Sequence, residues 1–291
     1  MSFITHDESL ILKKLEEGEV VGIPTETVYG LAADYQNEKA IQKIFKIKNR
    51  PTQHPLIMHV LPEWDLSQWV LSIPPQAKDL MKKFWPGPLT LVFRLKANAV
   101  SPLITGGQDT VAIRAPSHPL MISLLKSFGK PLVAPSANPF EKLSPTTAQH
   151  VQKHFIHENL VILDGGRCEV GIESTIVDMA NRIGQVLRPG QLNLSSTNFE
   201  PSTIKVPGAC TKHYQPHKPC YYFDNIQQLD IPLDDYYVMC FNAYKALKID
   251  YQFPDDFQQI CYEFYYQLKI ADESRFKNIL IERPVGQTLQ M

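Results

Sequence analysis

The sequence predicts an α/β protein: a mixed, twisted sheet with helices, followed by a small C-terminal α/β domain. Short β-rich runs alternate with helical patterns over the first 200 residues. Several of these runs follow one another without a helix between them, which favours a mixed sheet over a regular doubly wound one. Residues 207–291 hold 16 of the 29 aromatic residues, and so sharp a change in composition is typical of a domain boundary.

The strands that we expect in the first domain are short and are bounded by glycine and proline. In chain order they span 20–23, 56–60, 89–94, 111–114, 132–134, 160–163, 175–177 and 185–187. Helical spacing of apolar residues predicts helices over 7–17, 38–48, 76–84, 119–128 and 145–154. Gly18 is expected to end the first helix and Asn37 to cap the second. Ser144 before Pro145 is typical of an N-cap and predicts where the last helix begins.

Three segments follow from this pattern. We expect a first domain over 1–200, a linker over 201–219 and a small α/β domain over 220–291. The linker is rich in serine, threonine and proline and lacks sustained periodicity, as a connector should. The last segment is predicted to run strand–strand–helix–strand, with its clearest strands at 237–241 and 279–281.

Composition and motifs exclude several classes of protein. A hydrophobic fraction of 44% and a charged fraction of 20% are ordinary for a globular chain, and no apolar run is long enough to span a membrane. The signature motifs of P-loop ATPases, Rossmann dehydrogenases, α/β-hydrolases and zincins are missing. The five cysteines are widely spaced without a CxxC pair, which indicates reduced thiols in a cytoplasmic protein.

One pattern resembles a metal site. His150, His154 and His157 recur at helical spacing, which would place three imidazoles on one helix face. Because no acidic or cysteine partner stands nearby, we interpret them as a solvated face. We therefore assign no metal ligand.

Polar residues follow several predicted strands and carry the candidate binding groups. The strand near residue 23 ends in two threonines around Glu26, a common setting for a small ligand and equally for a polar turn. Lys48 and Arg50 stand at a helix end, where they suit a polyphosphate or simply complement the helix dipole. Arg114 ends an apolar strand, where it can clamp a carboxylate or phosphate or be an ordinary edge residue.

Hydroxyl groups, one side-chain amide and one further cation complete the candidates. They are Ser136, Asn138, Ser144, Ser174, Thr175 and Arg188. The helix N-terminus near Ser144 would also attract phosphate. Four separated cations and many hydroxyls without an acid–base dyad fit an anionic nucleotide plus a small zwitterion. Catalysis would then depend on positioning and charge stabilisation.

Eight motifs occur in a fixed order along the first domain. They are PTETVYGL at 24–31, K-x-R-P and then PL at 48–56, FWPGPLTLVF at 84–93, VAIRAPSHP at 111–119, APSAN at 134–138, SPT at 144–146, ESTIVD at 173–178 and LRPG at 187–190. This series resembles the YrdC-like family, the threonylcarbamoyl-AMP synthases. The linker PGACTKHYQPHKP at 207–219 is similar to that of the family's two-domain form, with a reduced second domain.

The resemblance implies a reaction and a set of partners. L-threonine, bicarbonate or CO2, and ATP would give threonylcarbamoyl-AMP and pyrophosphate, with Mg2+ assisting. The product would pass to a separate transferase that modifies a tRNA adenosine beside the anticodon, so stable tRNA binding by this chain is not expected.

The resemblance also implies roles for residues of this chain. Those around L-threonine would be Thr27, His59, Arg114, Ala134 and Ser174. Those that hold ATP would be Arg50, His54, Thr110, Ser136, Ser144, Arg188 and Tyr214. Lys48 and Arg50 would be the catalytic cations beside the phosphates. Many relatives have asparagine where His54 stands.

Two other functions stay open at this stage. One is an RNA-binding module of the same fold, although residues 1–206 carry 21 basic and 19 acidic residues, a weak positive balance for RNA. The other is a carbamoyltransferase with a YrdC-like segment. Those enzymes carry cysteine-rich zinc modules, and the spacing of the cysteines here does not provide one.

Overall fold

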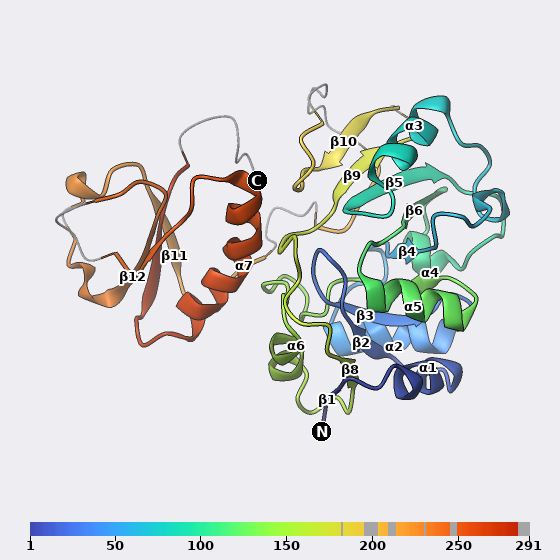
Figure 1. Ribbon diagram of the computed structural model, residues 1–291, viewed down its shortest axis with the longest axis horizontal. Helices are drawn as coiled ribbons and strands as arrows, with labels where there is room; N and C mark the ends of the chain where they lie inside the picture. Colours follow the sequence, from blue (N-terminus) through green and yellow to red (C-terminus); the bar gives the residue numbers. More distant parts are fainter. Residues whose placement is uncertain (182, 195–202, 209–213, 230, 245–248, 285–291) are drawn as a thin grey trace.

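The computed structural model describes every residue except 182, 195–202, 209–213, 230, 245–248 and 285–291 (Figure 1). A large sheet with its helices makes up the N-terminal part of the chain, and a smaller sheet makes up the C-terminal part (Figure 1). Helix α7 (Phe257–Glu273) lies between the two sheets. Within the described residues, no helix is long and apolar enough to cross a membrane.

Ten strands of the described chain form the large sheet, in the order β1-β8-β2-β3-β7-β4-β6-β5-β9-β10. Their bounds are β1 Phe3–Thr5, β2 Val21–Ile23, β3 Gly30–Asp34, β4 Ile57–His59, β5 Leu89–Arg94, β6 Thr110–Arg114, β7 Leu132–Val133, β8 Val161–Leu163, β9 Thr175–Asp178 and β10 Gln185–Arg188. Strand β4 pairs with β6 in parallel and with β7 antiparallel. The mixed sheet predicted from the sequence is therefore confirmed.

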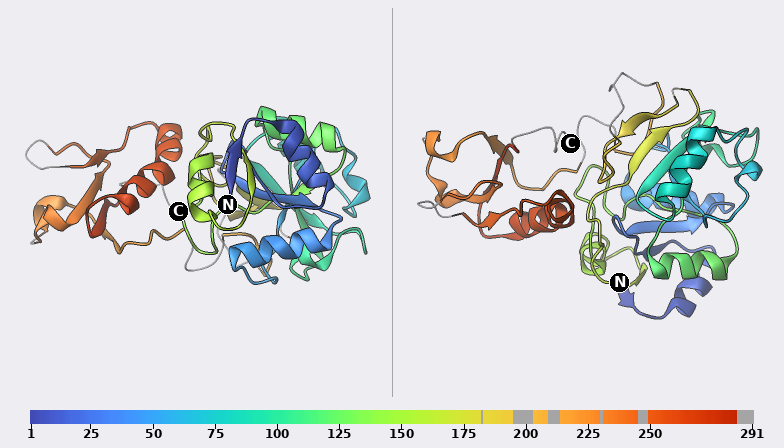
Figure 2. Two further views of the ribbon diagram at one scale, coloured as in Figure 1. Left: turned by 90° about the horizontal axis from the view of Figure 1, so that it is seen from below. Right: turned by 45° about the horizontal axis from the view of Figure 1, so that its top comes forward.

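Helices cover both faces of this sheet. They are α1 Glu8–Glu16, α2 Glu38–Lys48, α3 Pro75–Phe84, α4 Pro102–Thr105, α5 Pro119–Phe128 and α6 Ala148–His154, with a 3-10 turn η1 Leu66–Gln68. Leu31 of β3 belongs to the same buried cluster as Ile41 of α2, whereas Ala32 belongs to the cluster with Ile11 of α1. This alternation is what a strand covered on both faces requires. Figure 2 shows α1 in dark blue and α2 in lighter blue on opposite sides of the sheet.

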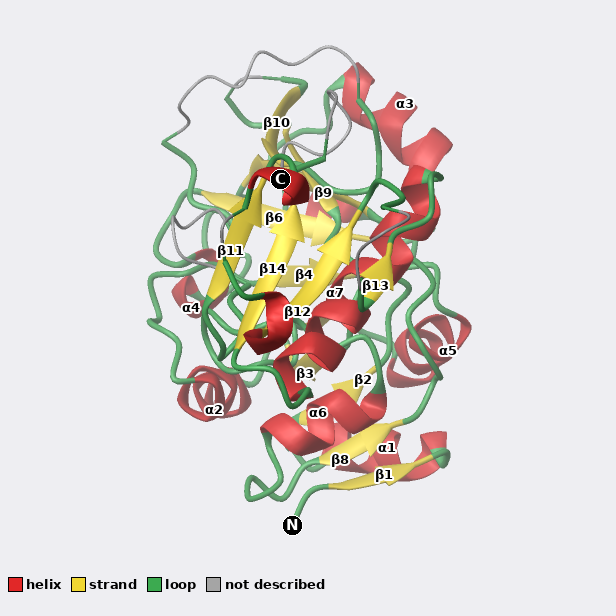
Figure 3. Cartoon of the chain, turned by 90° about the vertical axis from the view of Figure 1, so that its left-hand side faces the viewer, coloured by secondary structure: helices red, strands yellow, loops and turns green. Residues whose placement is uncertain are grey.

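The C-terminal part is a parallel four-stranded sheet, in the order β11-β14-β12-β13 (Figure 3). Its elements are β11 Cys220–Phe223, β12 Tyr236–Cys240, β13 Tyr251–Gln252 and β14 Asn278–Glu282, with 3-10 turns η2 Ile226–Gln228 and η3 Leu233–Asp235. Helix α7 covers the face that looks towards the N-terminal part and buries Ile260, Tyr265 and Leu268.

Helix α7 also packs directly on the N-terminal part. The guanidinium of Arg167 lies between the rings of Tyr262 and Tyr266, 3.7 Å and 3.8 Å from their centroids, and donates to the Tyr262 carbonyl at 2.7 Å. Lys153 pairs with Glu273 at 2.7 Å. A hydrophobic cluster joins residues from both parts: Val28, Leu143, Val170, Ile172, Tyr237, Met239, Phe253, Ile260 and Ile281 among them. The two parts therefore share a packed interface.

Most predicted elements are confirmed, including both expected C-terminal strands. Four of the described strands and helices were not predicted: β1, β3, α4 and β13, the last of which adds a third strand before α7. The β3 sequence, GLAAD, has no β-branched residue and becomes a strand through antiparallel pairing with β2 and β7. The boundaries proposed at 200 and 219 stay predictions, because the segment between them includes residues outside the described ranges.

Two local predictions are wrong. Ser144 does not cap α6: Thr147 does, by accepting from the His150 amide, while the Ser144 hydroxyl donates to Glu173. His150 and His154 do not form a solvated face either. Helix α7 packs over them, with the Tyr266 ring centroid 5.7 Å from that of His150. In both cases a contact from distant sequence overrides the local pattern.

Gly171 tests the importance of this packing. Its φ is +79°, and a Cβ there would lie 2.7 Å from the Cys261 carbonyl and from the Tyr262 backbone on α7. Gly171→Ala should lower the free energy of unfolding by about 1–3 kcal/mol more than Gly166→Ala. Gly166 is the matched control because its φ is +78° and nothing lies within 4 Å of its added Cβ. Urea unfolding measures the difference, and equal losses would show that α7 does not press on Gly171.

Candidate active site

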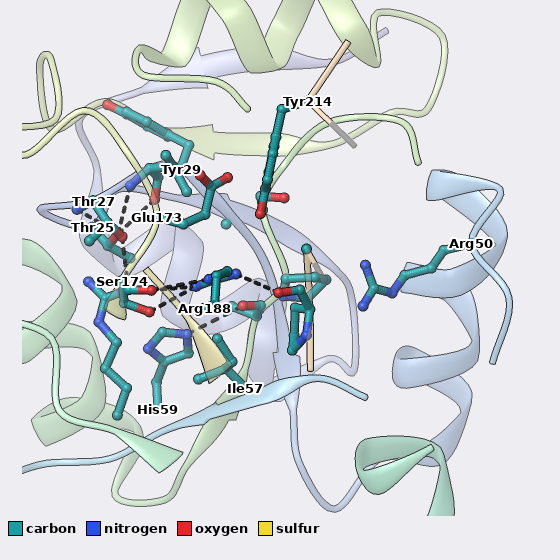
Figure 4. A pocket seen from close by; sticks show the side chains of 18 residues that line it. Thr25, Thr27, Tyr29, Arg50, Ile57, His59, Glu173, Ser174, Arg188 and Tyr214 are labelled. Carbon is teal, nitrogen blue, oxygen red and sulfur yellow. Dashed lines mark hydrogen bonds between the residues drawn. The ribbon is translucent and has the colours of Figure 1, made fainter. Parts of the chain in front are cut away.

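A small cavity of about 40 Å³ lies at the ends of the central strands (Figure 4). Its lining comes from separate parts of the chain and consists of Thr25, Thr27, Val28, Tyr29, Gly30, Arg50, Ile57, His59, Arg114, Ala134, Pro135, Ser136, Glu173, Ser174, Arg188, Pro207, Gly208 and Tyr214. A bound water needs about 10–15 Å³. The cavity therefore has room for about three waters.

Arg114 and His59 lie side by side because their strands pair in parallel. They are register partners at the carboxyl ends of β6 and β4. Arg114 forms an ion pair with Glu26 at 2.6 Å, both side chains being almost fully buried, and donates to the Thr27 hydroxyl at 2.8 Å. Its Nε donates to the Gly87 carbonyl at 3.3 Å. These contacts hold a buried guanidinium in one orientation at the cavity wall.

His59 is a neutral imidazole in this setting. Burial, followed by the charge of Arg114, lowers its pKa to about 3. Its Nε2 lies 3.3 Å from the Ala134 carbonyl, which can only accept, so Nε2 carries the proton. Nδ1 is then an acceptor, and it has no hydrogen-bond partner among the described residues. A ligand hydroxyl or ammonium group could donate to it.

Arg188 ties the opposite wall to the segment that follows β10. It donates to the Ser174 carbonyl at 2.9 Å and 3.1 Å and to the Ser174 hydroxyl at 3.0 Å, and these bonds are drawn in Figure 4. Its third nitrogen, Nη1, donates to the Pro207 carbonyl at 2.8 Å. The Ser174 and Thr90 hydroxyls are 2.7 Å apart. Ser174 is thus fixed from two sides.

Arg50 reaches the cavity from the side opposite to Thr27 (Figure 4). Helix α2 ends at Lys48, and the left-handed conformation of Asn49 turns the chain. Arg50 donates to the Pro55 carbonyl at 3.0 Å and lies over the Phe140 ring. Lys48 is buried just outside the lining and donates to the carbonyls of Ser136 and Asn138. Burial and then the Arg50 charge hold its pKa well below the ordinary value.

Glu173 is the acidic residue of the described lining. Its Oε1 accepts from the Ser144 hydroxyl and its Oε2 accepts from the Tyr265 hydroxyl at 2.6 Å. Tyr265 belongs to α7, so the C-terminal part contacts a residue of the cavity directly. Tyr214, from the segment between the two parts, packs on Tyr265 with ring centroids 5.6 Å apart.

The structure brings most of the predicted site residues together. The lining includes Thr27, Arg50, His59, Arg114, Ala134, Ser136, Ser174, Arg188 and Tyr214. Four others lie outside it. Lys48 lies behind Ser136, and Ser144 lies behind Glu173. His54 packs on the Phe140 ring, and Thr110 starts the strand that Arg114 ends, roughly 13 Å away. Their proposed contacts with ATP stay predictions.

Sequence reasoning missed several residues of the site. They include Tyr29, Ile57, Glu173, Pro207 and Gly208 of the lining, with Glu26 and Tyr265 just behind it. Glu173 directly precedes Ser174, which was a candidate binding residue. Its negative charge beside that residue was a sequence signal that could have identified it. Glu26 likewise stands between two candidate threonines. Tyr265 gave no signal, because it lies 92 residues from Glu173.

The cavity suits anions and small polar groups. Three arginines, several hydroxyls and a neutral imidazole line it. Such a set can bind a carboxylate and phosphates and stabilise charge that develops on them. It lacks a paired nucleophile and base among the described residues of the lining.

Two family models match the chain. One, for the Sua5, YciO and YrdC proteins, is described as "Telomere recombination" and matches residues 13–190. The chain belongs to this family. The second, described as "Threonylcarbamoyl-AMP synthase, C-terminal domain", matches residues 175–290. The Sua5/YciO/YrdC match thus covers most of the N-terminal part, and the second match covers the C-terminal part.

Curated relatives of this family carry the name threonylcarbamoyl-AMP synthase. The one from Bacillus subtilis is 42% identical over 221 residues, which is 70% of this chain and 63% of the relative. The one from Pyrococcus abyssi is 41% identical over 216 residues, 69% of this chain and 63% of the relative. The chain therefore spans just under two thirds of the length of these relatives.

Solved structures extend the similarity. Pyrococcus abyssi Sua5 complexed with L-threonine superposes with a TM-score of 0.84 at 31% identity, covering 98% of this chain and 92% of that one. Escherichia coli YciO has a TM-score of 0.58 at 21% identity, covering 67% of this chain and 98% of its own. HypF, in a phosphate- and nucleotide-bound form, has a TM-score of 0.55 at 17% identity over 62% of this chain and 28% of its own. The last two share the fold alone.

His59 leads to a prediction about acid stability. Its folded pKa of about 3 lies below the unfolded value of about 6.5. Below about pH 6.5, His59 is therefore protonated in the unfolded chain but stays neutral in the folded chain. The free energy of unfolding should therefore decrease as the pH is lowered. At pH 5, His59 alone should reduce it by about 2 kcal/mol relative to neutral pH. The His59→Gln variant should lose correspondingly less free energy of unfolding than wild type between pH 7 and pH 5.

Chemical unfolding at the two pH values measures this loss. His150 and His154 have pKa values lowered by burial to about 4 and about 3, and they contribute with the same sign in both proteins. The comparison therefore isolates His59. His6→Gln, at an exposed position, is the control. An equal acid loss in wild type and His59→Gln would contradict a neutral, buried His59.

Proposed function

We propose that this protein is an L-threonylcarbamoyladenylate synthase, which makes threonylcarbamoyl-AMP and pyrophosphate from L-threonine, bicarbonate or CO2, and ATP. The observation that carries the proposal is the fixed, buried Arg114 beside the neutral His59 in a cavity that two further arginines line. The names of the relatives and the L-threonine complex of Pyrococcus abyssi Sua5 support it.

The proposed threonine site uses the wall around Arg114. Arg114 binds the threonine carboxylate as a charge-assisted pair. The Nδ1 acceptor of His59 receives a hydrogen bond from the threonine hydroxyl, and Thr27, Ser174 and the Ala134 backbone complete the site. Because the carboxylate is held at Arg114, the amine is left free to react.

The proposed reaction has two steps. The threonine amine first combines with bicarbonate, losing water, to form a carbamate. A carbamate oxygen then attacks the α-phosphorus of ATP, and the bond to the β-phosphate oxygen breaks to release pyrophosphate. Negative charge grows on the phosphates as this bond breaks, and in this proposal Arg50 and Arg188, which line the cavity, stabilise it. Lys48 supports this wall through the carbonyls of Ser136 and Asn138.

Mg2+ fits the site only as a companion of ATP. The described residues contain no group of three or more His, Cys, Asp or Glu side chains that could hold a metal ion. Glu173 is the carboxylate of the described lining, and hydroxyls already occupy both of its oxygens. Mg2+ would be held mainly by phosphate oxygens and water, as is usual for this ion, and would neutralise phosphate charge.

The wider role is proposed from the chemistry of the product. Threonylcarbamoyl-AMP is an activated acyl donor, which we propose passes to a separate tRNA-modifying transferase in the cytoplasm. The net charge of −1 supports a protein without a stable tRNA complex of its own. The cysteines of the described chain, Cys168, Cys220, Cys240 and Cys261, are unpaired, which suits a reducing compartment.

Pyrophosphate release tests the proposal directly. The rate with all three substrates should fall to background when L-threonine, bicarbonate or ATP is omitted in turn. Arg50→Ala removes one charge-assisted contact with the phosphates, which is typically about 2–4 kcal/mol of transition-state stabilisation. The rate should then drop by roughly 30- to 1000-fold.

Lys46→Ala is the matched control, since Lys46 is an exposed cation in the last turn of the helix that precedes Arg50. It should keep near-normal activity. Thermal melts establish that both variants fold. Pyrophosphate release that does not require threonine would refute the proposed function, and a folded Arg50→Ala protein with normal turnover would refute the role of Arg50.

A further inference from the structure

Glu173 connects the cavity to the C-terminal part of the chain. It lies beside Ser174 in the lining and is largely buried. It also lines a second, larger cavity of about 790 Å³, which extends between the two parts and shares Glu173, Arg188, Gly208 and Tyr214 with the first. The Tyr265 hydroxyl, from α7, donates to it at 2.6 Å. Glu173 thus stands where the two cavities meet.

The charge of Glu173 acts on residues in and around the site proposed for ATP. It raises the pKa of Lys48 against the larger lowering by burial and by Arg50. The Tyr214 and Tyr265 hydroxyls have pKa values raised, first by burial and then by Glu173, while Arg188 opposes this. A carboxylate that moved towards these cations would compete with the phosphates for them.

Two hydroxyl groups hold the carboxylate in place. Ser144 donates to one oxygen and Tyr265 to the other. A buried carboxylate oxygen that loses its hydrogen-bond donor costs free energy, because it is neither hydrated nor hydrogen-bonded. We therefore expect the carboxylate to turn towards the nearest remaining partner. The cations nearby are Arg50 and Arg188, which line the cavity with Glu173, and Lys48, whose pKa Glu173 raises.

We propose that Tyr265 is a positioning residue for the reaction: its hydroxyl holds Glu173 away from the cations that bind ATP. The inference rests on the proposed function and deepens it, because it makes the C-terminal part a component of the catalytic site. Tyr265 acts through Glu173 and need not touch the substrates.

The ring and the hydroxyl of Tyr265 have separable roles. The ring is buried in the cluster that joins the two parts and packs on Tyr214 and Phe264. Tyr265→Phe keeps these contacts and removes only the donor to Glu173. Arg114, the proposed anchor of the threonine carboxylate, is held separately, by the Glu26 ion pair and the Thr27 hydroxyl. The effect of Tyr265→Phe should therefore fall on ATP and spare threonine.

Steady-state kinetics of pyrophosphate release on the full-length chain test this inference. Tyr265→Phe should raise the KM for ATP by about 5- to 30-fold, as expected for loss of one hydrogen bond to a buried charge, and change the KM for L-threonine by less than about 2-fold. In a Glu173→Gln background, adding Tyr265→Phe should have less than about 2-fold further effect. Tyr262→Phe is the matched control on the same helix, where the ring and the backbone carbonyl contact Arg167.

Each outcome decides between the alternatives. A normal KM for ATP in folded Tyr265→Phe would overturn the inference, and so would equal effects on both substrates or full additivity with Glu173→Gln. If Glu173→Gln does not fold, the split between ATP and threonine in Tyr265→Phe alone decides. A wild-type protein that forms no threonylcarbamoyl-AMP would instead count against the proposed function, whatever Tyr265 does.

Discussion

The burial of a guanidinium at the end of β6 is the constraint on which the rest of the site depends. An unpaired charge of this kind is too costly to keep inside a protein, so Arg114 requires Glu26 and the Thr27 hydroxyl beside it. This fixes the loop after β2 against the strand ends. The parallel pairing of β4 with β6 then places His59 next to Arg114, and the positive charge helps to keep that imidazole neutral. One buried ion pair thus sets the geometry of the wall and the protonation of its neighbour.

The sequence predicted the fold where local signals were strong. The apolar, β-branched runs of β5 and β6 and the capped, amphipathic α2 were found with nearly the right ends. Prediction failed where tertiary contacts decide. GLAAD has little strand propensity, yet it is a strand because β2 and β7 pair with it. The hydroxyl of Ser144 was expected to cap a helix but is used by Glu173.

The sequence indicated the cations and hydroxyl groups of the site, but not the acidic residues that contact them. Nine of the proposed binding residues line one cavity because the ends of central strands and their loops converge there. Glu26 and Glu173 adjoin residues of interest in the sequence, but which cations they would meet depends on the fold. Tyr265 could not be foreseen, since the docking of α7 alone brings it to Glu173. The same docking, seen at Arg167 and Gly171, makes the C-terminal part a structural support of the cavity.

The central claim is that Arg114 anchors the carboxylate of L-threonine while Glu26 keeps that cation folded in place. Calorimetric titration of L-threonine into wild type, Glu26→Gln and the double variant Glu26→Gln/Arg114→Gln tests it most directly. The double variant avoids leaving a buried charge unpaired, and thermal melts verify that each protein folds. Glu26→Gln leaves Arg114 without its ion pair and should lose stability, but the folded variant should still bind threonine. The double variant should bind at least about 30-fold more weakly than wild type, as expected for loss of a buried charge pair. Equal affinities for Glu26→Gln and the double variant would contradict the account.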